Sequence, residues 1–320
     1  MGSRSSEQSS RVGTFVERDI KTRRGPDGLH VFGRRSGLNI LADEVEIPPT
    51  EWDRAPRHVS IALTNACDLS CSFCYAPKAR RSLDFGRVLS WIEELDREGC
   101  LGVGFGGGEP TLYRRLPELC EYAARKTSLA VSITSHGHFD NKLINELRGN
   151  VHFIRISMDG TSSTYESIRQ RKFGALLEKL GPIGRIVPFG INVVVNARTL
   201  LALDDVIQVA HEFGACELAL LPEVPNSRSG GIDEATKAAL MEWICQYRGR
   251  VRICVSESGS VGLPVCNPCS KETGLRAYAH IDASGSLKRC SYDEKGTEIG
   301  PKGIIDAIQE LQADGEGNEK

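Results

Sequence analysis

Three closely spaced cysteines, Cys67, Cys71 and Cys74, lie within the eight-residue segment CDLSCSFC. The segment follows the apolar run HVSIAL, so we expect a loop after a strand, where three thiolates can surround one metal centre. Along a strand, alternate side chains would point to opposite faces. Structural zinc usually takes four protein ligands, whereas a [4Fe-4S] cluster held by three cysteines leaves one iron open for an outside ligand. A zinc loop and cysteines buried in a core are the alternatives.

This loop resembles the signature of the radical S-adenosylmethionine (radical SAM) superfamily, C-x3-C-x-aromatic-C, with Phe73 as the aromatic residue. The resemblance implies a partial (β/α)6 barrel and a [4Fe-4S] cluster held by the three cysteines. It also implies that the amino and carboxylate groups of SAM bind the open iron and that Phe73 packs near the adenine. Reduction of such a cluster cleaves SAM to methionine and a 5'-deoxyadenosyl radical, which abstracts hydrogen from an unactivated carbon.

Two further segments resemble SAM-binding segments of the family. GGGEPTLY, with Gly107, Gly108 and Glu109, is similar to the family's GGE motif. Bare backbone lets a ligand approach closely and a carboxylate can accept from an ammonium group, so we expect this motif to bind the methionine amino group of SAM. SITSHGHF resembles a segment that often reads T-N-G in relatives, but here Ser135 and His136 fill the first two positions. A tight strand-to-helix turn is the alternative for the glycine run.

The segment IRISMDG resembles the family's S-x-D-G motif. Ser157 and Asp159 are therefore expected to hydrogen-bond the ribose or the methionine end of SAM. Arg169 falls where relatives often carry an arginine that faces the SAM carboxylate. An Asp-Gly turn at a strand end is the alternative for Asp159, and a solvated helical arginine is the alternative for Arg169.

A second group of cysteines lies near the C-terminal end of the sequence. Cys266 and Cys269 form a C-x2-C pair, and the spacing from Cys269 through Gly285 to Cys290 resembles the C-x(9 to 15)-G-x4-C pattern of the SPASM and Twitch extensions. Because no cysteine follows Cys290, the resemblance implies a Twitch-like module with one auxiliary [4Fe-4S] cluster. Cys254 is the nearest fourth ligand; without it, one iron stays open. A zinc site is the alternative.

The elements that must position these residues follow from the hydrophobic pattern. From residue 58 onward, short apolar runs alternate with segments of helical spacing. Six such alternations predict an α/β fold with a parallel sheet covered by helices, because parallel strands need crossover connections. The carboxyl ends of the strands are the expected active edge. The strands are expected at 58–63, 102–105, 130–134, 153–157, 191–196 and 217–221.

We divide the chain into three parts. Residues 1–55 form an N-terminal extension with a β-hairpin within 29–47, residues 56–250 form the radical SAM core, and residues 251–320 form the small module with the second cysteine group. This module is expected to contain two strands around the turn DASG and a last helix. The polar ends of the chain, residues 1–22 and 313–320, are expected to fray.

Composition excludes several classes of protein. The net charge of -2 gives no basic excess, so nucleic acid is not expected as a partner. No segment approaches the roughly 18 consecutive apolar residues of a membrane span, and the N-terminal stretch lacks the apolar core of a signal peptide. We therefore expect a soluble, cytoplasmic protein whose eleven cysteines stay reduced. Those outside the two groups are expected in the core: Cys100, Cys120, Cys216 and Cys245.

Two classes of function stay open on the sequence: a radical SAM enzyme, and a non-catalytic iron-sulfur or zinc binding protein. The GGE and S-x-D-G matches favour the enzyme, because a metal scaffold needs no SAM pocket. Its expected substrate is a small molecule or a peptide, in natural-product or cofactor biosynthesis, and a peptide maturase that forms a crosslink or thioether is the alternative. A reductant such as flavodoxin or ferredoxin is the expected protein partner. The sequence identifies no general base.

Overall fold

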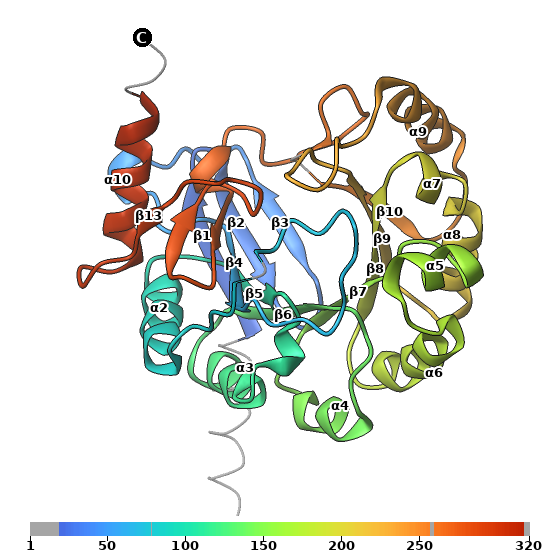
Figure 1. Ribbon diagram of the computed structural model, residues 1–320. Coiled ribbons are helices and arrows are strands. Elements are labelled where there is room, and N and C mark those ends of the chain that lie inside the picture. The colour runs from blue at the N-terminus through green and yellow to red at the C-terminus, as the bar shows by residue number, and fades with distance from the viewer. Residues whose placement is uncertain (1–18, 78, 257–258, 317–320) are drawn as a thin grey trace, which may run out of the picture.

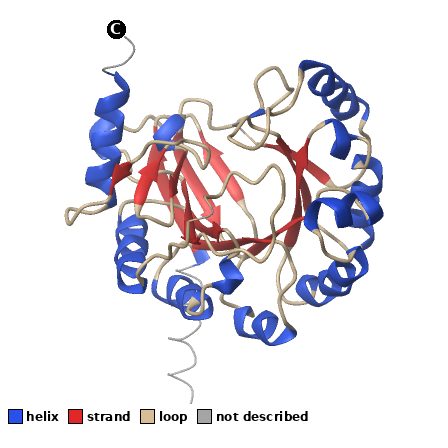
Figure 2. Ribbon diagram, in the orientation of Figure 1, coloured by secondary structure: helices blue, strands red, loops and turns tan. Residues whose placement is uncertain are grey.

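The computed structural model describes residues 19–77, 79–256 and 259–316 of the chain. Within these residues, a ten-stranded sheet forms the centre and helices cover its outer face (Figures 1 and 2). The sheet curves into an incomplete barrel, and its parallel part follows chain order, as the predicted alternation requires. The strands of this part are β4 (His58–Thr64), β5 (Gly102–Gly107), β6 (Ala130–Ser135), β7 (Phe153–Ser157), β8 (Phe189–Val195), β9 (Glu217–Pro222) and β10 (Arg252–Val255). All six strands expected from the sequence are confirmed.

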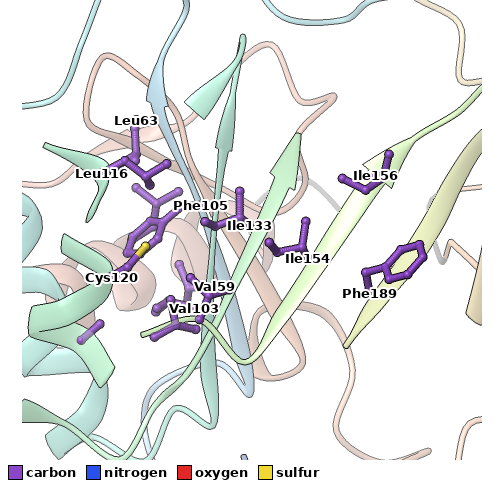
Figure 3. Close-up of a cluster of buried hydrophobic side chains, with 14 of the residues drawn as sticks. Val59, Leu63, Val103, Phe105, Leu116, Cys120, Ile133, Ile154, Ile156 and Phe189 are labelled. Carbon is purple, nitrogen blue, oxygen red and sulfur yellow. The ribbon is translucent and has the colours of Figure 1, made fainter. Parts of the chain in front are cut away.

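The strands form because alternate residues are apolar and point outward, toward the helices. Val59, Val103, Phe105, Ile133 and Ile154 are all buried in this layer (Figure 3). Each such side chain contributes roughly 1.5–3 kcal/mol by leaving water. The described helices are α2 (Phe85–Arg97), α3 (Leu116–Lys126), α4 (Asn141–Leu147), α5 (Ser162–Arg169), α6 (Phe173–Gly184), α7 (Ala197–Leu200), α8 (Leu203–Glu212), α9 (Glu234–Gln246) and α10 (Ile304–Glu316), with short 3-10 turns at Pro49–Glu51, Pro110–Leu112 and Gly274–Arg276. None of these described helices is long and apolar enough to cross a membrane.

A separate antiparallel sheet precedes the barrel. Its strands are β1 (Ile20–Gly25), β2 (Gly28–Gly33) and β3 (Asn39–Ala42), in that order. The expected hairpin corresponds to β2 and β3, but β1 was not expected. The prediction that residues up to 22 fray is therefore wrong for residues 20–22, which pair with β2; residues 1–18 lie outside the described part of the chain.

The C-terminal segment extends the barrel sheet. β11 (Tyr278–Ile281) pairs in parallel with β4, and β12 (Ser286–Lys288) and β13 (Thr297–Glu298) follow in antiparallel order. The expected turn at DASG joins β11 to β12. The predicted fraying from residue 313 is wrong as far as Glu316, where α10 ends; residues 317–320 lie outside the described part.

Candidate active site

A cavity of about 1320 Å³ lies inside the curved sheet, lined by residues of β4 to β11, the cysteine loop and the N-terminal sheet. The glycine-rich sequence of β5 makes part of this space. Val103 and Phe105 point into the outer core, whereas Gly104 and Gly106 line the cavity. A Cβ atom at Gly106 would have no heavy atom within 4 Å. The inner face of the sheet therefore leaves room for a ligand.

The first cysteine group lies at this cavity, in the loop after β4, as expected. Cys71 is buried, and Cys67 and Cys74 are half-buried. Leu69 N donates to Cys67 Sγ at 3.4 Å, and Cys74 N donates to the Cys71 carbonyl at 3.2 Å. Burial raises the pKa of the Cys67 and Cys71 thiols, so a bound metal would be needed to hold them as thiolates.

Three thiols on one loop can serve two kinds of metal centre. A [4Fe-4S] cube binds each thiolate at a different iron, whereas structural zinc takes all its ligands at one ion. Among the described residues, no three His, Cys, Asp or Glu side chains converge as ligands of one ion.

Asp68, inside the cysteine loop, ties the loop to two distant segments. Its Oδ1 lies 2.8 Å from His136 Nε2, just after β6, and its Oδ2 accepts from Arg171 Nη2 at 2.6 Å. His136 is buried and lines the cavity. In the sequence, His136 stands at a position that departs from the family's T-N-G segment, and no local pattern pairs Asp68 with residues so far along the chain.

A second support for the cysteine loop comes from the segment after β9. Asn226 Nδ2 donates to the Phe73 carbonyl at 3.3 Å, and Arg228 Nη1 donates to the Cys74 carbonyl at 2.8 Å. These bonds hold the backbone around the last cysteine. Asn226 and Arg228 were not predicted, because a loop residue that contacts only backbone carries no sequence motif.

The glycines of the GGE segment pack against the start of the cysteine loop. Gly107 has a φ of 127°, and a Cβ atom there would lie 2.3 Å from the Thr64 carbonyl oxygen. A Cβ atom on Gly108 would lie 2.3 Å from the Ala66 carbonyl oxygen. Both glycines line the cavity, but their Cβ positions face the protein's own backbone. We had expected them to admit a ligand; their immediate effect is to let the cysteine loop lie against β5.

Glu109 is 1% exposed and lines the cavity. Its Oε1 accepts from Thr111 Oγ1 at 2.7 Å and from Ser135 Oγ at 2.8 Å, and its Oε2 accepts from His136 N at 2.9 Å. Thr111 N also donates to Oε1, at 3.2 Å, so four hydrogen bonds hold the carboxylate, and Oε2, which accepts one of them, is the less occupied oxygen. Ser135 thus contacts Glu109 directly and orients its carboxylate.

The S-x-D-G residues separate into two positions. Ser157 lines the cavity, whereas Asp159 is fully buried behind its wall. Asp159 Oδ1 accepts from Val194 N at 2.7 Å, and its Oδ2 pairs with Arg169 Nη2. The geometry therefore gives Asp159 a positioning role toward Arg169, in place of the expected direct contact with SAM.

Arg169 lies at the cavity wall, with its guanidinium carbon 5.9 Å from the centroid of the Phe73 ring. Burial lowers the pKa of Arg169 and the Asp159 carboxylate raises it, and the net shift is upward. Arg169 is therefore always a cation. Its Nε is buried and has no hydrogen-bond partner among the described residues, which leaves a donor for an anionic ligand such as a carboxylate.

The second cysteine group is less compact. Cys266 is exposed, Cys269 is buried near Arg57 at the start of β4, and Cys290 Sγ donates to Asp293 Oδ1 at 3.1 Å. Of the three, Cys290 lines the cavity.

The proposed fourth ligand, Cys254, lies on β10. Its Sγ donates to Glu217 Oε2 at 3.7 Å. Its role as a fourth ligand stays a prediction.

The remaining cysteines divide evenly between interior and surface. Cys100 and Cys120 are buried, as expected, but Cys216 and Cys245 are exposed. The expectation of a core position is therefore wrong for these two. Cys216 lies just before β9 and lines the cavity, whereas Cys245 lies on the outer face of α9.

Three observations on this chain fit a cluster with bound SAM. The cysteine loop offers three thiols at one rim of the cavity, the buried carboxylate of Glu109 lies at its wall, and Arg169 Nε is a buried donor without a partner among the described residues. The thiols can hold iron, Glu109 matches an ammonium group and Arg169 matches a carboxylate.

Residues 61–181 match the family model of the radical SAM superfamily. The chain is 29% identical over 197 residues to the sporulation killing factor maturation protein SkfB of Bacillus subtilis. The aligned region covers 58% of this chain and 47% of that protein. It is 32% identical over 205 residues to the PqqA peptide cyclase of Rhodopseudomonas palustris. This aligned region covers 60% of this chain and 52% of that protein. The chain thus spans about half the length of these relatives.

The fold is similar to that of Streptococcus suis SuiB bound to S-adenosylmethionine. The TM-score is 0.72 at 13% identity, and the match covers 92% of this chain and 89% of that chain. At this identity the likeness shows the fold alone, and it confirms the expected α/β architecture with a partial barrel. The fold and site define a protein with an incomplete parallel barrel and a three-cysteine loop at its rim. Residues 61–181 of that fold are similar to the radical SAM superfamily, whose members use a [4Fe-4S] cluster and SAM.

Proposed function

We propose that this protein is a radical SAM enzyme that cleaves SAM reductively and abstracts a hydrogen atom from a peptide substrate. The observation that carries the proposal is the position of Cys67, Cys71 and Cys74 on one loop at the rim of the large cavity. When bound there, a [4Fe-4S] cluster supplies the electron that converts SAM to methionine and a 5'-deoxyadenosyl radical. The chain itself binds and orients SAM and keeps water away from the radical.

Each part of SAM has a matching group in the cavity. Glu109 is the acceptor for the ammonium group, and Arg169, held by Asp159, is the donor for the carboxylate. Ser157 is placed to hydrogen-bond the ribose or the methionine end, and Phe73 packs beside the adenine. These roles are supported by the burial and hydrogen bonds of Glu109 and by the unpaired Nε of Arg169.

A peptide is the substrate class that the relatives favour. The PqqA peptide cyclase acts on a peptide by its name, and SuiB, whose fold this chain shares with a TM-score of 0.71, has been observed with its precursor peptide SuiA. A cavity of about 1320 Å³ exceeds the usual 300–1,000 Å³ of a small-molecule pocket, so it has room for SAM and a peptide side chain together. A small-molecule substrate is the alternative.

We also propose an auxiliary [4Fe-4S] cluster in the C-terminal segment, held by Cys266, Cys269 and Cys290. The support is the matching spacing and the position of Cys290 at the cavity wall. A low-potential reductant such as flavodoxin or ferredoxin would deliver the electron to the first cluster. The eleven cysteines are compatible with a cytoplasmic location, where thiols stay reduced.

The test is formation of 5'-deoxyadenosine from SAM by the anaerobically reconstituted protein under dithionite. Changing Cys67, Cys71 and Cys74 together to Ala should abolish it and leave the protein folded, because the loop lies at the rim of the sheet. Cys245→Ala removes an exposed thiol outside the cavity and is the matched control. SAM cleavage by the triple variant, or a protein that binds only zinc, would contradict the proposal.

A further inference from the structure

We propose that the wall of the cavity holds a carboxylate-binding subsite formed by Arg155 and Arg252 around Glu217, which takes an acidic side chain of the substrate. We call these three residues the Arg–Glu–Arg group. The inference rests on the proposed function for its premise of a peptide substrate. It adds that the cavity would select peptides with an acidic side chain.

Strand register brings the group to one level of the barrel. Arg155 on β7 pairs with Gly190 on β8, Gly190 pairs with Glu217 on β9, and Glu217 pairs with Arg252 on β10. Side chains in register on parallel strands share a face, and all three charged residues line the cavity. A Cβ atom on Gly190 would lie 2.9 Å from Glu217 Cγ. The missing side chain therefore lets Arg155 reach across β8 to the carboxylate.

The group carries an uncompensated positive charge. Glu217 is buried, with 4% of its side chain exposed, and its two oxygens pair with Arg155 and Arg252. Two guanidinium groups share one carboxylate, which leaves one net positive charge at the cavity wall.

Arg252 is the member of the group that is free to bind a ligand. Its side chain is 70% exposed, and among the described residues its guanidinium is paired through Nη2 with Glu217. The other donors of a planar guanidinium can hold a second carboxylate in bidentate geometry. Arg155 is held more firmly, because its Nη1 also donates to Asn192 Oδ1 at 3.2 Å.

The opposite wall offers hydrogen bonds without charge. Ser60 Oγ lies 2.6 Å from Tyr278 Oη and 2.7 Å from His280 Nδ1. Burial lowers the pKa of His58 and His280 to about 4, and Arg155 adds to the effect at His58. These histidines are therefore neutral at pH 7. The histidines of β4 and β11 therefore add no charge to that of the Arg–Glu–Arg group.

The subsite lies close to the residues assigned to SAM. Arg155 is two residues before Ser157 on β7, so the two side chains share a face and are separated by about 7 Å along the strand. Both line the same cavity. A substrate held by its carboxylate at the Arg–Glu–Arg group would therefore occupy the cavity that also holds SAM.

The inference is tested by binding, without turnover. The reconstituted full-length protein with SAM is titrated with N-acetyl-glutamate N-methylamide, its glutamine counterpart and inorganic phosphate, and ligand-observed NMR gives the dissociation constants. We expect the glutamate probe to bind at least about tenfold more tightly than the glutamine probe, because charge-assisted hydrogen bonds to arginine are lost with glutamine. Equal binding of the two would overturn the inference. Phosphate binding that displaces the glutamate probe at lower concentration would overturn the assignment to an acidic side chain.

Two variants separate ligand binding from a purely structural ion pair. Arg252→Gln should remove the preference for glutamate over glutamine. Glu217→Gln should strengthen glutamate binding several-fold, because it frees both guanidinium groups from their internal partner; a purely structural network would give no such gain. Arg185→Gln, at an exposed arginine outside the cavity, is the control and should leave all three constants unchanged. Retained preference in Arg252→Gln would overturn the inference.

Failure of the carboxylate-binding subsite and failure of the proposed function give different results. SAM cleavage by the unchanged protein is measured separately, under dithionite. Cleavage without any preference for the glutamate probe would overturn the subsite alone. Absence of cleavage in a fully reconstituted protein would contradict the proposed activity, and the binding constants would still decide the subsite.

Discussion

At the scale of single residues, Asp159 orients a cavity-lining side chain, Arg169, although it does not line the cavity itself. It is fully buried, it accepts from Val194 N at 2.7 Å, and its other oxygen pairs with Arg169. The pair places a permanent cation at the wall and leaves Arg169 Nε without a partner among the described residues. Asp159 thus holds Arg169 in position, and under the proposed function it acts on SAM through Arg169.

Asp159→Asn should weaken SAM binding by about tenfold, since the neutral amide no longer fixes the Arg169 guanidinium by a charge-assisted hydrogen bond. The dissociation constant of SAM is measured on reconstituted protein, together with iron content, which should not change. Asp205→Asn alters an exposed carboxylate whose contact with Thr161 is 3.4 Å long, and it serves as the control. Unchanged SAM affinity in Asp159→Asn would show that Arg169 does not depend on its partner.

Sequence motifs predicted the residues at the cavity better than they predicted their supports. The three cysteines, Glu109 and Arg169 all lie at the cavity wall, because each belongs to a short local pattern. The contact between Asp68 and His136 joins residues 68 positions apart, and no local pattern encodes it. The periodicity of apolar residues also could not tell that Cys216, at the very start of a strand, would be exposed.

At the scale of elements, β5 makes room for a ligand. Its outward residues fill the core, while Gly104 and Gly106 leave the inner face of the strand bare. Glycine in a strand costs roughly 0.5–1 kcal/mol relative to Ala. The space differs between the two glycines: a Cβ atom on Gly104 would lie 3.1 Å from His58 Nε2, whereas one on Gly106 would meet no heavy atom within 4 Å, so Gly106 is the position that leaves room for a ligand.

Gly106→Val should leave the fold at least as stable and reduce SAM cleavage by at least about tenfold. A Cβ atom at this position meets no heavy atom within 4 Å, and valine favours strands, so the side chain fills cavity space without strain. Thermal denaturation and 5'-deoxyadenosine formation are measured in parallel. Gly300→Val adds the same side chain in open space outside the cavity and should keep full activity. A destabilised Gly106→Val protein would contradict the expected open space.

A buried ion network joins three elements that are far apart in the sequence. Arg23 of β1 is 1% exposed and its Nη2 lies 2.6 Å from Glu272 Oε1, while Arg57 Nε donates to Glu272 Oε2 at 2.9 Å. Asp27 accepts from the backbone N–H of Lys271 and of Glu272, each at 2.9 Å. Glu272 therefore connects the N-terminal sheet and the start of the barrel to the segment that follows Cys269.

Glu272→Ala should lower the free energy of unfolding by about 3–5 kcal/mol, because it leaves the Arg23 charge buried without a partner. Glu51→Ala removes a carboxylate from an exposed pair with Arg24 at 3.9 Å and should cost no more than about 1 kcal/mol. Urea denaturation followed by circular dichroism measures both. Equal costs for the two variants would contradict the role of the network.

The same network predicts a pH dependence. Burial raises the pKa of Glu272, but Arg23 and Arg57 lower it, and the net shift is downward. Its stabilising contribution is therefore fully present above the unfolded pKa of about 4.3 and is lost as the pH falls through the lower folded value. The difference in unfolding free energy between the unchanged protein and Glu272→Gln should shrink from pH 7 to about pH 3. A difference that grows in acid would contradict this sign.

The order of strands and helices along the chain could be predicted from the sequence, but the pairing between distant strands could not. The strand residues of β4 to β9 carry clear apolar runs, and DASG marks the turn between β11 and β12. β11 pairs with β4, which lies far earlier in the chain. No local sequence pattern predicts such a pairing. The apolar pattern does not reveal β1, because half of the residues in IKTRRG are charged; the strand depends on pairing with β2 and on burial of Arg23 against Glu272.

At the scale of the whole molecule, the C-terminal segment contacts two separate parts of the barrel, the first cysteine loop and the start of β4. Tyr292, two residues after Cys290, packs against Tyr75, the neighbour of Cys74, with ring centroids 4.9 Å apart. Cys290 therefore lies close to the first cysteine loop, whereas Cys269 lies beside Arg57 at the start of β4. Among the described residues these cysteines do not converge, so one cluster held by all of them requires the segment with Cys266 and Cys269 to move toward Cys290.

The last prediction is that the anaerobically reconstituted protein contains about eight irons per chain, four for each of two cubes. Changing Cys266, Cys269 and Cys290 together to Ala should reduce this to about four and preserve SAM cleavage, because the first loop is held by separate contacts through Asp68, Asn226 and Arg228. The exposed Cys266 must move to reach a common cluster, so metal binding should also order this loop and slow its proteolysis. Iron, zinc and 5'-deoxyadenosine are measured on the same samples. About four irons with one zinc in the unchanged protein would replace the auxiliary cluster with a zinc site, and loss of SAM cleavage in the triple variant would show that the two cysteine groups are not independent.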